Sequence, residues 1–146
     1  MKNIKERLDV LLNTLEPELS RLRRDFHKHA EAGWCEYRTA SLVARRLEEL
    51  GYQIRLGREV VDEKSRMALP DEDLMEERYR RALSEGAVEK YAEKMRGGFT
   101  GVVAEIRGGA GPTTAFRFDM DAVEMEERAT EGHPPAKEGF ASIHPE

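Results

Sequence analysis

Two aspartates separated by a single residue are the side chains of this chain best placed to do chemistry. Asp119 and Asp121 follow the run Thr113 to Phe118, whose threonines and phenylalanines are typical of a strand. Residues two apart on an extended backbone point to the same side, so the two carboxylates can share one cation or one proton. Ligands also bind at the carboxyl ends of strands in open α/β sheets. The alternative is that these acids only solvate a loop.

The histidines and the single cysteine form no pattern typical of a metal or nucleophile site. His27 and His29 are two apart in a predicted helix, so their side chains diverge by about 200° and are poorly placed to chelate one ion. For one of them we expect a structural role, or a role in supporting a metal ligand. His133 and His144 stand beside prolines in an irregular tail, where solvated loop residues are the default. Cys35 opens a predicted helix, which can lower a thiol pKa, but an inert small side chain is the preferred interpretation.

Composition limits the function classes that the chain can serve. It has 146 residues, of which 39% are hydrophobic and 36% charged, and this is typical of one soluble globular domain. The formal net charge of −5 is concentrated after residue 118, which argues against a nucleic-acid surface. A lone cysteine suits a reducing compartment, and the chain shows neither a membrane span nor a signal-peptide core. We therefore expect a cytoplasmic protein without membrane or nucleic-acid partners.

The apolar spacing of the first fifty residues predicts two helices. A stripe with steps of three and four residues indicates a helix over about 2–30. Pro17 falls inside it, so we expect one helix kinked there, with two abutting helices as the alternative. Gly33 ends this helix, and a second is expected over 37–50 with Gly51 as its C-terminal cap. The members of the stripe are Ile4, Leu8, Leu11, Leu15, Leu19, Leu22 and Phe26.

Strands and a helical insertion are expected in the rest of the chain. Alternating residues predict strands at 52–56 and 99–107, and the charge-rich stretch 71–96 between them predicts two helices divided at Gly86. Its charges are spaced to pair across helical turns, so we expect a solvated helical hairpin and the least stable part of the fold. A third strand at 113–118 is expected to pair antiparallel with 99–107 through a hairpin connection. The fold class is therefore α/β.

Three segments together resemble a known enzyme family. Residues 23–34 read RRDFHKHAEAGW, residues 36–40 read EYRTA, and residues 116–122 read FRFDMDA. They resemble signature segments of the metal-dependent amidohydrolases that include hippurate hydrolase and the auxin-conjugate hydrolases. Further segments resemble the branch of this family that acts on p-aminobenzoyl-glutamate; they are residues 57–61, 65–67, 69–72 and 97–101, together with the helical insertion.

The resemblance implies a fold and an activity. It implies the amino-terminal part of a co-catalytic zinc-peptidase-like domain, with a mixed sheet, flanking helices and a helical insertion. Residues 1–146 are then an incomplete catalytic domain, with the dimerisation domain absent. The complete enzyme is expected to cleave p-aminobenzoyl-glutamate to p-aminobenzoate and glutamate, and the chain alone is expected to be inactive. The alternative is a non-catalytic module that binds a partner, or a complementing fragment of a split hydrolase.

The resemblance also implies a cofactor and partners. Family members use two divalent ions, manganese or zinc, held by a thiolate and histidine motif that this sequence does not contain. Asp119 and Asp121 are therefore expected to support a metal site rather than complete one, and no metal is expected to bind this chain tightly. Asp119 matches a position where related peptidases carry histidine, and Asp121 is expected to orient a metal ligand. A second hydrolase subunit or a homodimer partner is expected to bind through the missing domain.

Overall fold

The computed structural model describes residues 3–123, 125, 127–128, 130 and 132–144. Their contacts divide the chain into two compact units, Met1–Ala30 with Glu124–Glu146, and Glu31–Val123. No helix in these ranges is long and apolar enough to cross a membrane.

The first unit contains the long helix α1 (Ile4–Lys28) and the short helix α5 (Pro134–Lys137). The Asn3 side chain caps α1 by accepting a hydrogen bond from the Lys5 amide. The helix is continuous through Pro17, as one of the two expected arrangements requires. The Ile143 amide donates to the Lys28 carbonyl at 2.9 Å, which ties the C-terminal stretch to the end of α1.

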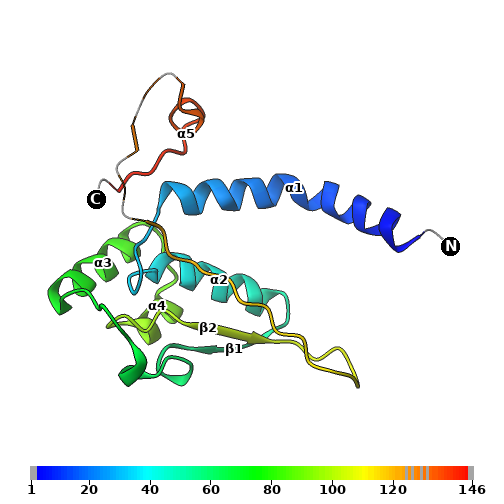
Figure 1. Ribbon diagram of the computed structural model, residues 1–146, viewed down its shortest axis with the longest axis horizontal. Coiled ribbons are helices and arrows are strands. Elements are labelled where there is room, and N and C mark those ends of the chain that lie inside the picture. Colours follow the sequence, from blue (N-terminus) through cyan, green and yellow to red (C-terminus); the bar gives the residue numbers. More distant parts are fainter. Residues whose placement is uncertain (1–2, 124, 126, 129, 131, 145–146) are drawn as a thin grey trace. The chain divides into compact units, whose positions relative to one another are not determined.

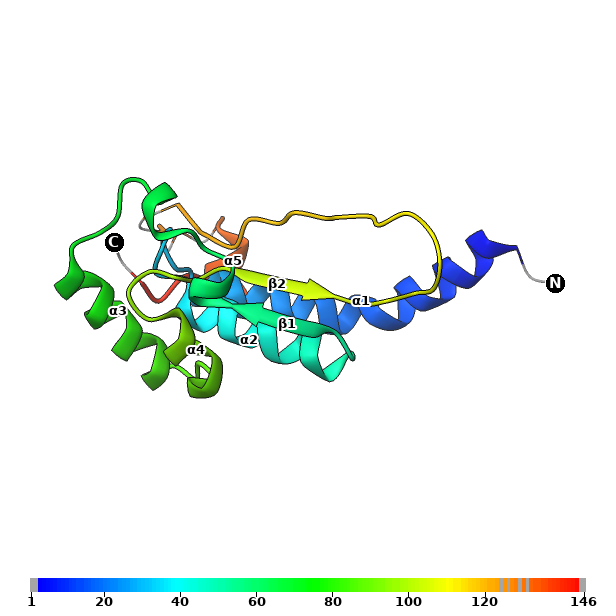
Figure 2. The same ribbon diagram turned by 90° about the horizontal axis from the view of Figure 1, so that it is seen from below.

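The second unit is built on helix α2 (Tyr37–Glu49) and a two-stranded sheet (Figures 1 and 2). Strand β1 (Gln53–Leu56) pairs antiparallel with β2 (Val102–Glu105), with Gln53 opposite Glu105 and Leu56 opposite Val102. Two short 3-10 turns, η1 (Gly57–Glu59) and η2 (Glu63–Ser65), follow β1. Helices α3 (Glu72–Ser84) and α4 (Glu89–Met95) then lead to β2, and α2 packs against both strands.

The expected third strand at 113–118 is wrong. In the structure β2 pairs with β1, and the described residues 106–123 form no strand. Figure 2 shows this stretch turning beyond β2 and running back as an extended trace. Phe116 and Phe118 are 78% and 80% exposed and stack on each other at 6.4 Å. Without a hydrophobic surface to cover, their strand propensity does not produce a ladder, because that propensity depends on packing.

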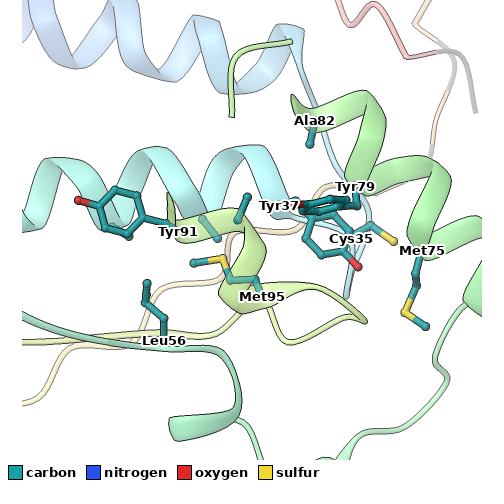
Figure 3. Close-up of a cluster of buried hydrophobic side chains, with 11 residues drawn as sticks. Cys35, Tyr37, Leu56, Met75, Tyr79, Ala82, Tyr91 and Met95 are labelled. Atoms are coloured by element: carbon teal, nitrogen blue, oxygen red, sulfur yellow. The ribbon is translucent and has the colours of Figure 1, made fainter. Parts of the chain in front are cut away.

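The expectation of a solvated insertion is also wrong. Its two helices form as predicted, but one face of each is buried against α2 (Figure 3). The insertion supplies six of the eleven residues of the main buried cluster. Its Tyr79 ring meets Tyr37 of α2 edge to face, with the centroids 5.5 Å apart. The six residues are Met75, Tyr79, Ala82, Tyr91, Ala92 and Met95.

We predict that Met95→Ala destabilises the protein by about 2 to 5 kcal/mol, because it leaves a cavity where a fully buried side chain stood. Met67→Ala is the matched control, since Met67 is 79% exposed, and it should change stability by less than about 0.5 kcal/mol. Urea unfolding followed by circular dichroism measures both variants. Equal, small effects would mean that the insertion is solvated after all.

Candidate functional site

The Asp119 to Ala122 segment is fastened to the start of the second unit by its backbone. The Ala122 amide donates to the Glu31 carbonyl at 2.8 Å. Asp119 is exposed and forms an ion pair with Arg117 at 2.6 Å. Asp121 is exposed as well, but its negative charge acts on the nearby carboxyl of Glu36. The two aspartates therefore interact with different neighbours, and their role in supporting a metal site stays a prediction.

Glu36 is a buried carboxyl beside the candidate site that the sequence pattern did not single out. It stands at the N-cap position of α2 and is only 9% exposed. The Thr100 hydroxyl, just before β2, donates to Glu36 Oε2 at 2.5 Å. Burial raises the pKa of Glu36, and the Asp121 carboxylate adds to the rise, while the Thr100 hydrogen bond opposes it. Glu36 therefore joins the start of α2 to Thr100 next to β2, and its carboxyl lies close enough to Asp121 to feel that charge.

Glu31 is a second buried carboxylate, and it caps α2. Its Oε1 accepts from the Arg38 amide at 2.9 Å and its Oε2 from the Thr39 amide at 2.8 Å. These amides belong to the first turn of the helix, where backbone donors have no partner within the helix. Burial raises the Glu31 pKa, and the two backbone hydrogen bonds oppose the rise. A carboxylate in this place satisfies two donors and the positive end of the helix dipole together.

Polar side chains of the first turns of α2 hold the insertion. The Gly98 amide donates to the Tyr37 hydroxyl at 2.9 Å, and the Val88 amide donates to Ser41 Oγ at 2.9 Å. Arg38 Nε donates to the Glu85 carbonyl at 3.0 Å. Burial raises the pKa of Tyr37 to about 12, so its hydroxyl stays neutral. Through these contacts the start of α2 holds the insertion to the rest of the second unit.

Gly98 lets the chain pass close to this junction. Its φ is +80°, which favours glycine, and a Cβ there would lie 2.9 Å from Met75 Sδ. Trp34 has φ of 67° although it is not glycine, and its Nε1 donates to the Met67 carbonyl at 3.0 Å. Backbone in this region is strained, so its surroundings must hold Trp34 in place. Gly98, within one of the quoted segments, thus has a steric reason to be glycine.

Cys35 is buried in the core of the second unit, and the sequence interpretation of an inert side chain stays a prediction. It is 4% exposed, and burial followed by the charge of Glu36 raises its pKa to about 11. The thiol therefore stays protonated near neutral pH and behaves as a small core side chain.

The histidines belong to the first unit. His27 Nε2 and Glu127 Oε1 are 2.5 Å apart, and Glu127 also accepts from the Ser142 amide at 2.7 Å. His29 Nδ1 lies 2.9 Å from the Asp25 carbonyl, and His144 Nδ1 lies 2.6 Å from the Ala30 carbonyl. These contacts are of the kind that a structural role requires. The assignment of His27 or His29 to such a role, or to the support of a metal ligand, stays a prediction.

The described residues do not themselves fit a metal site. Among them, no group of three or more histidine, cysteine, aspartate or glutamate side chains is arranged to hold an ion. Asp119 is occupied by Arg117, and Cys35 is held as a buried thiol. A closed metal site usually needs about four ligands, so this part of the chain cannot supply one.

Known proteins resemble the chain over nearly its whole length. It is 50% identical over 140 residues to one subunit of the p-aminobenzoyl-glutamate hydrolase of Escherichia coli, covering 95% of this chain and 32% of that protein. It is 48% identical over 139 residues to indole-3-acetyl-aspartic acid hydrolase of Enterobacter agglomerans, again with 32% of the relative covered. The chain is homologous to a segment of these hydrolases. No protein-family model matches it.

A solved structure confirms the fold. The aminobenzoyl-glutamate utilization protein of Klebsiella pneumoniae superposes with a TM-score of 0.78 and 52% identity, covering 80% of this chain and 30% of that one. The resemblance and the α/β fold class inferred from sequence are therefore confirmed. The chain spans about a third of the length of the curated relatives that it matches.

We predict that Glu36→Gln stabilises the protein more at about pH 8 than at about pH 4. The pKa of Glu36 is raised in the folded state, so its ionisation opposes folding, and parent stability falls as pH rises through that pKa. Glutamine keeps an acceptor for Thr100 and removes the charge that faces Asp121 and Glu31. Urea midpoints across this pH range measure the effect. Glu59→Gln, an exposed change on η1, is the control, and identical pH profiles for both variants would contradict the prediction.

Proposed function

We propose that this chain forms part of the catalytic domain of a hydrolase that cleaves p-aminobenzoyl-glutamate to p-aminobenzoate and glutamate. The observation that carries the proposal is the 50% identity over 140 residues to a protein named for that reaction. The Enterobacter relative is named for an amide of aspartate, so the substrate class is an amide to an acidic amino acid. The fold shared with the Klebsiella protein supports the same assignment.

In this proposal the chain contributes structure and support, while other residues contribute the metal ligands. The described residues make no ion site, so a divalent manganese or zinc ion would need ligands from elsewhere in a complete enzyme. We propose Asp121 as a residue that orients such a ligand, with Asp119 beside it. The chain alone is then inactive and binds metal weakly, as oxygen ligands from two carboxylates keep most of an ion's water in place.

The proposal also extends to partners and compartment. The Escherichia coli relative is named as one of the subunits of its hydrolase, which supports a second hydrolase subunit here; a homodimer partner is the other arrangement expected. We place the protein in the cytoplasm, for the composition reasons already given.

A complementing fragment is the second candidate function. It is favoured by the stretch 113–118, whose two phenylalanines are more than three-quarters exposed and whose backbone joins no sheet in the described part of the chain. Extended apolar segments of this kind bind other chains by adding a strand. A hydrolase chain that lacks the matching third would be the partner.

We predict that a chimaera in which this chain replaces the matching third of the Escherichia coli protein cleaves p-aminobenzoyl-glutamate, with kcat/KM within about tenfold of that protein. Released p-aminobenzoate is the readout, and indole-3-acetyl-aspartate is the comparison substrate. A folded chimaera that cleaves neither amide would overturn the proposed function. Cleavage of the aspartate conjugate alone would overturn the proposed substrate.

In the same chimaera, Asp121→Asn should lower metal content or kcat/KM by roughly 10- to 100-fold, the usual effect of losing a group that orients a ligand. Arg117→Gln is the matched control, because Arg117 lies on the same exposed stretch and pairs only with Asp119 among the contacts described. Full metal content and normal turnover in Asp121→Asn would contradict this role and favour the alternative that Asp121 only solvates a loop.

A further inference from the structure

A groove of about 550 Å³ lies within the second unit, between the turns after β1 and the start of helix α3. It is separate from the aspartate segment, which contributes no residue to its lining. Cationic, acidic and apolar side chains share its walls, and the ones on which the argument depends are Arg58, Glu63, Arg66, Met75 and Phe99.

Arg66 is the unusual member of this lining. Its side chain is only 7% exposed, although arginine is seldom buried. Its Nη1 donates to the Gly97 carbonyl at 2.6 Å, but its buried Nε has no hydrogen-bond partner among the described residues. A buried donor without an acceptor costs free energy, so Arg66 is held in a place that does not satisfy all of its donors.

A second arginine stacks on the same aromatic ring. The guanidinium carbons of Arg58 and Arg66 each lie 3.8 Å from the centroid of Phe99. The ring is 1% exposed and fixes both cations by cation–π contact. Two guanidinium groups that each stack on one ring at this distance lie on its opposite faces, and a carboxylate at the edge of the ring can form charged hydrogen bonds to both.

Glu63 now supplies a carboxylate to this pair, but only loosely. Its Oε2 lies 3.0 Å from Arg58 Nη1, and its Oε1 lies 3.9 Å from Arg66 Nη2. The Glu63 side chain is 64% exposed, and ion pairs of such exposure contribute little to stability. Asp62 holds the turn that presents Glu63, since it accepts from the Ser65 hydroxyl at 2.5 Å. An external carboxylate can therefore take the place of Glu63 without disturbing the core.

We propose that this groove binds the carboxylate of a small organic acid on Arg58 and Arg66, in place of Glu63. The apolar body of the ligand would lie against Met75, Leu69 and Pro70, which line the same groove. Glu72 and Asp73 line it as well, and they disfavour a second negative charge, so the ligand is a monocarboxylate. Arg96 and Arg80 each form an ion pair with Glu76 at 2.9 Å. Arg58 and Arg66 are therefore the cations proposed to bind the ligand. The proposal does not rest on the proposed hydrolase function.

Benzoate is the probe, titrated into the ¹⁵N-labelled full chain at constant ionic strength, with the Arg66 Nε–Hε resonance as the readout. Saturable binding is expected, and the isosteric neutral amide benzamide should give no saturable shift. Arg58→Gln should weaken benzoate binding by about tenfold, the effect of losing one charged hydrogen-bond partner. Glu63→Gln should strengthen binding several-fold, because it removes the competing carboxylate.

Glu59→Gln is the matched control, since Glu59 is an exposed acid on the neighbouring turn that does not line the groove, and it should leave the affinity unchanged. Arg58 is itself largely exposed, so its variant is expected to fold even if Arg66 cannot be replaced. Equal binding of benzoate and benzamide, or benzoate affinity unaltered by Arg58→Gln, would overturn the proposal. Absence of any saturable shift up to the solubility limit of sodium benzoate would do the same.

Discussion

The Glu31 carboxylate at the start of helix α2 is the contact on which the second unit depends. It satisfies two amides of the first turn, at Arg38 and Thr39, and so fixes where the helix begins. Its own carbonyl accepts from Ala122, so the same residue also fastens the aspartate segment. The side chain of this one buried residue therefore sets the helix start, and its main-chain carbonyl helps to position the candidate site.

Once α2 is fixed, its first turns organise the insertion. Tyr37, Arg38 and Ser41 bind the backbone at Gly98, Glu85 and Val88, all in or next to the insertion. These hydrogen bonds determine which faces of α3 and α4 meet α2, and the apolar faces of the two helices then pack against Tyr37. This explains how a charge-rich stretch comes to supply more than half of the main buried cluster. The charges stay on the outer faces, where they pair with one another, as Glu76 does with Arg96.

Local patterns in the sequence predicted the elements well, and long-range contacts poorly. Helices were expected over about 2–30, over 37–50 and on both sides of Gly86 within 71–96, and the structure has them at 4–28, 37–49, 72–84 and 89–95. Strands were expected from alternation at 52–56 and 99–107, and β1 and β2 lie within these ranges. The prediction of a strand at 113–118 was wrong because strand pairing depends on a surface to pack against, which composition does not reveal. The prediction of a solvated insertion was wrong because Tyr79, Tyr91 and Met95 look isolated in sequence, and only packing against α2 brings them together.

The same limit applied to the candidate site. Asp119 and Asp121 were found because they stand close together in sequence. Glu36 and Thr100 were missed because 64 residues separate them, and only the fold joins them. Glu31 gave no such signal, since a capping side chain is expected immediately before a helix and Glu31 lies six residues before Tyr37.

Hydrogen exchange on the Glu31→Ala variant tests most directly whether the start of α2 controls the second unit. If it does, the amides of Arg38 and Thr39 should exchange faster by at least about tenfold, and those of Val88, Gly98 and Ala122 should follow, because they hydrogen-bond to the same junction. Faster exchange at Arg38 and Thr39 alone, with the other three amides unchanged, would show that Glu31 is only a local helix cap.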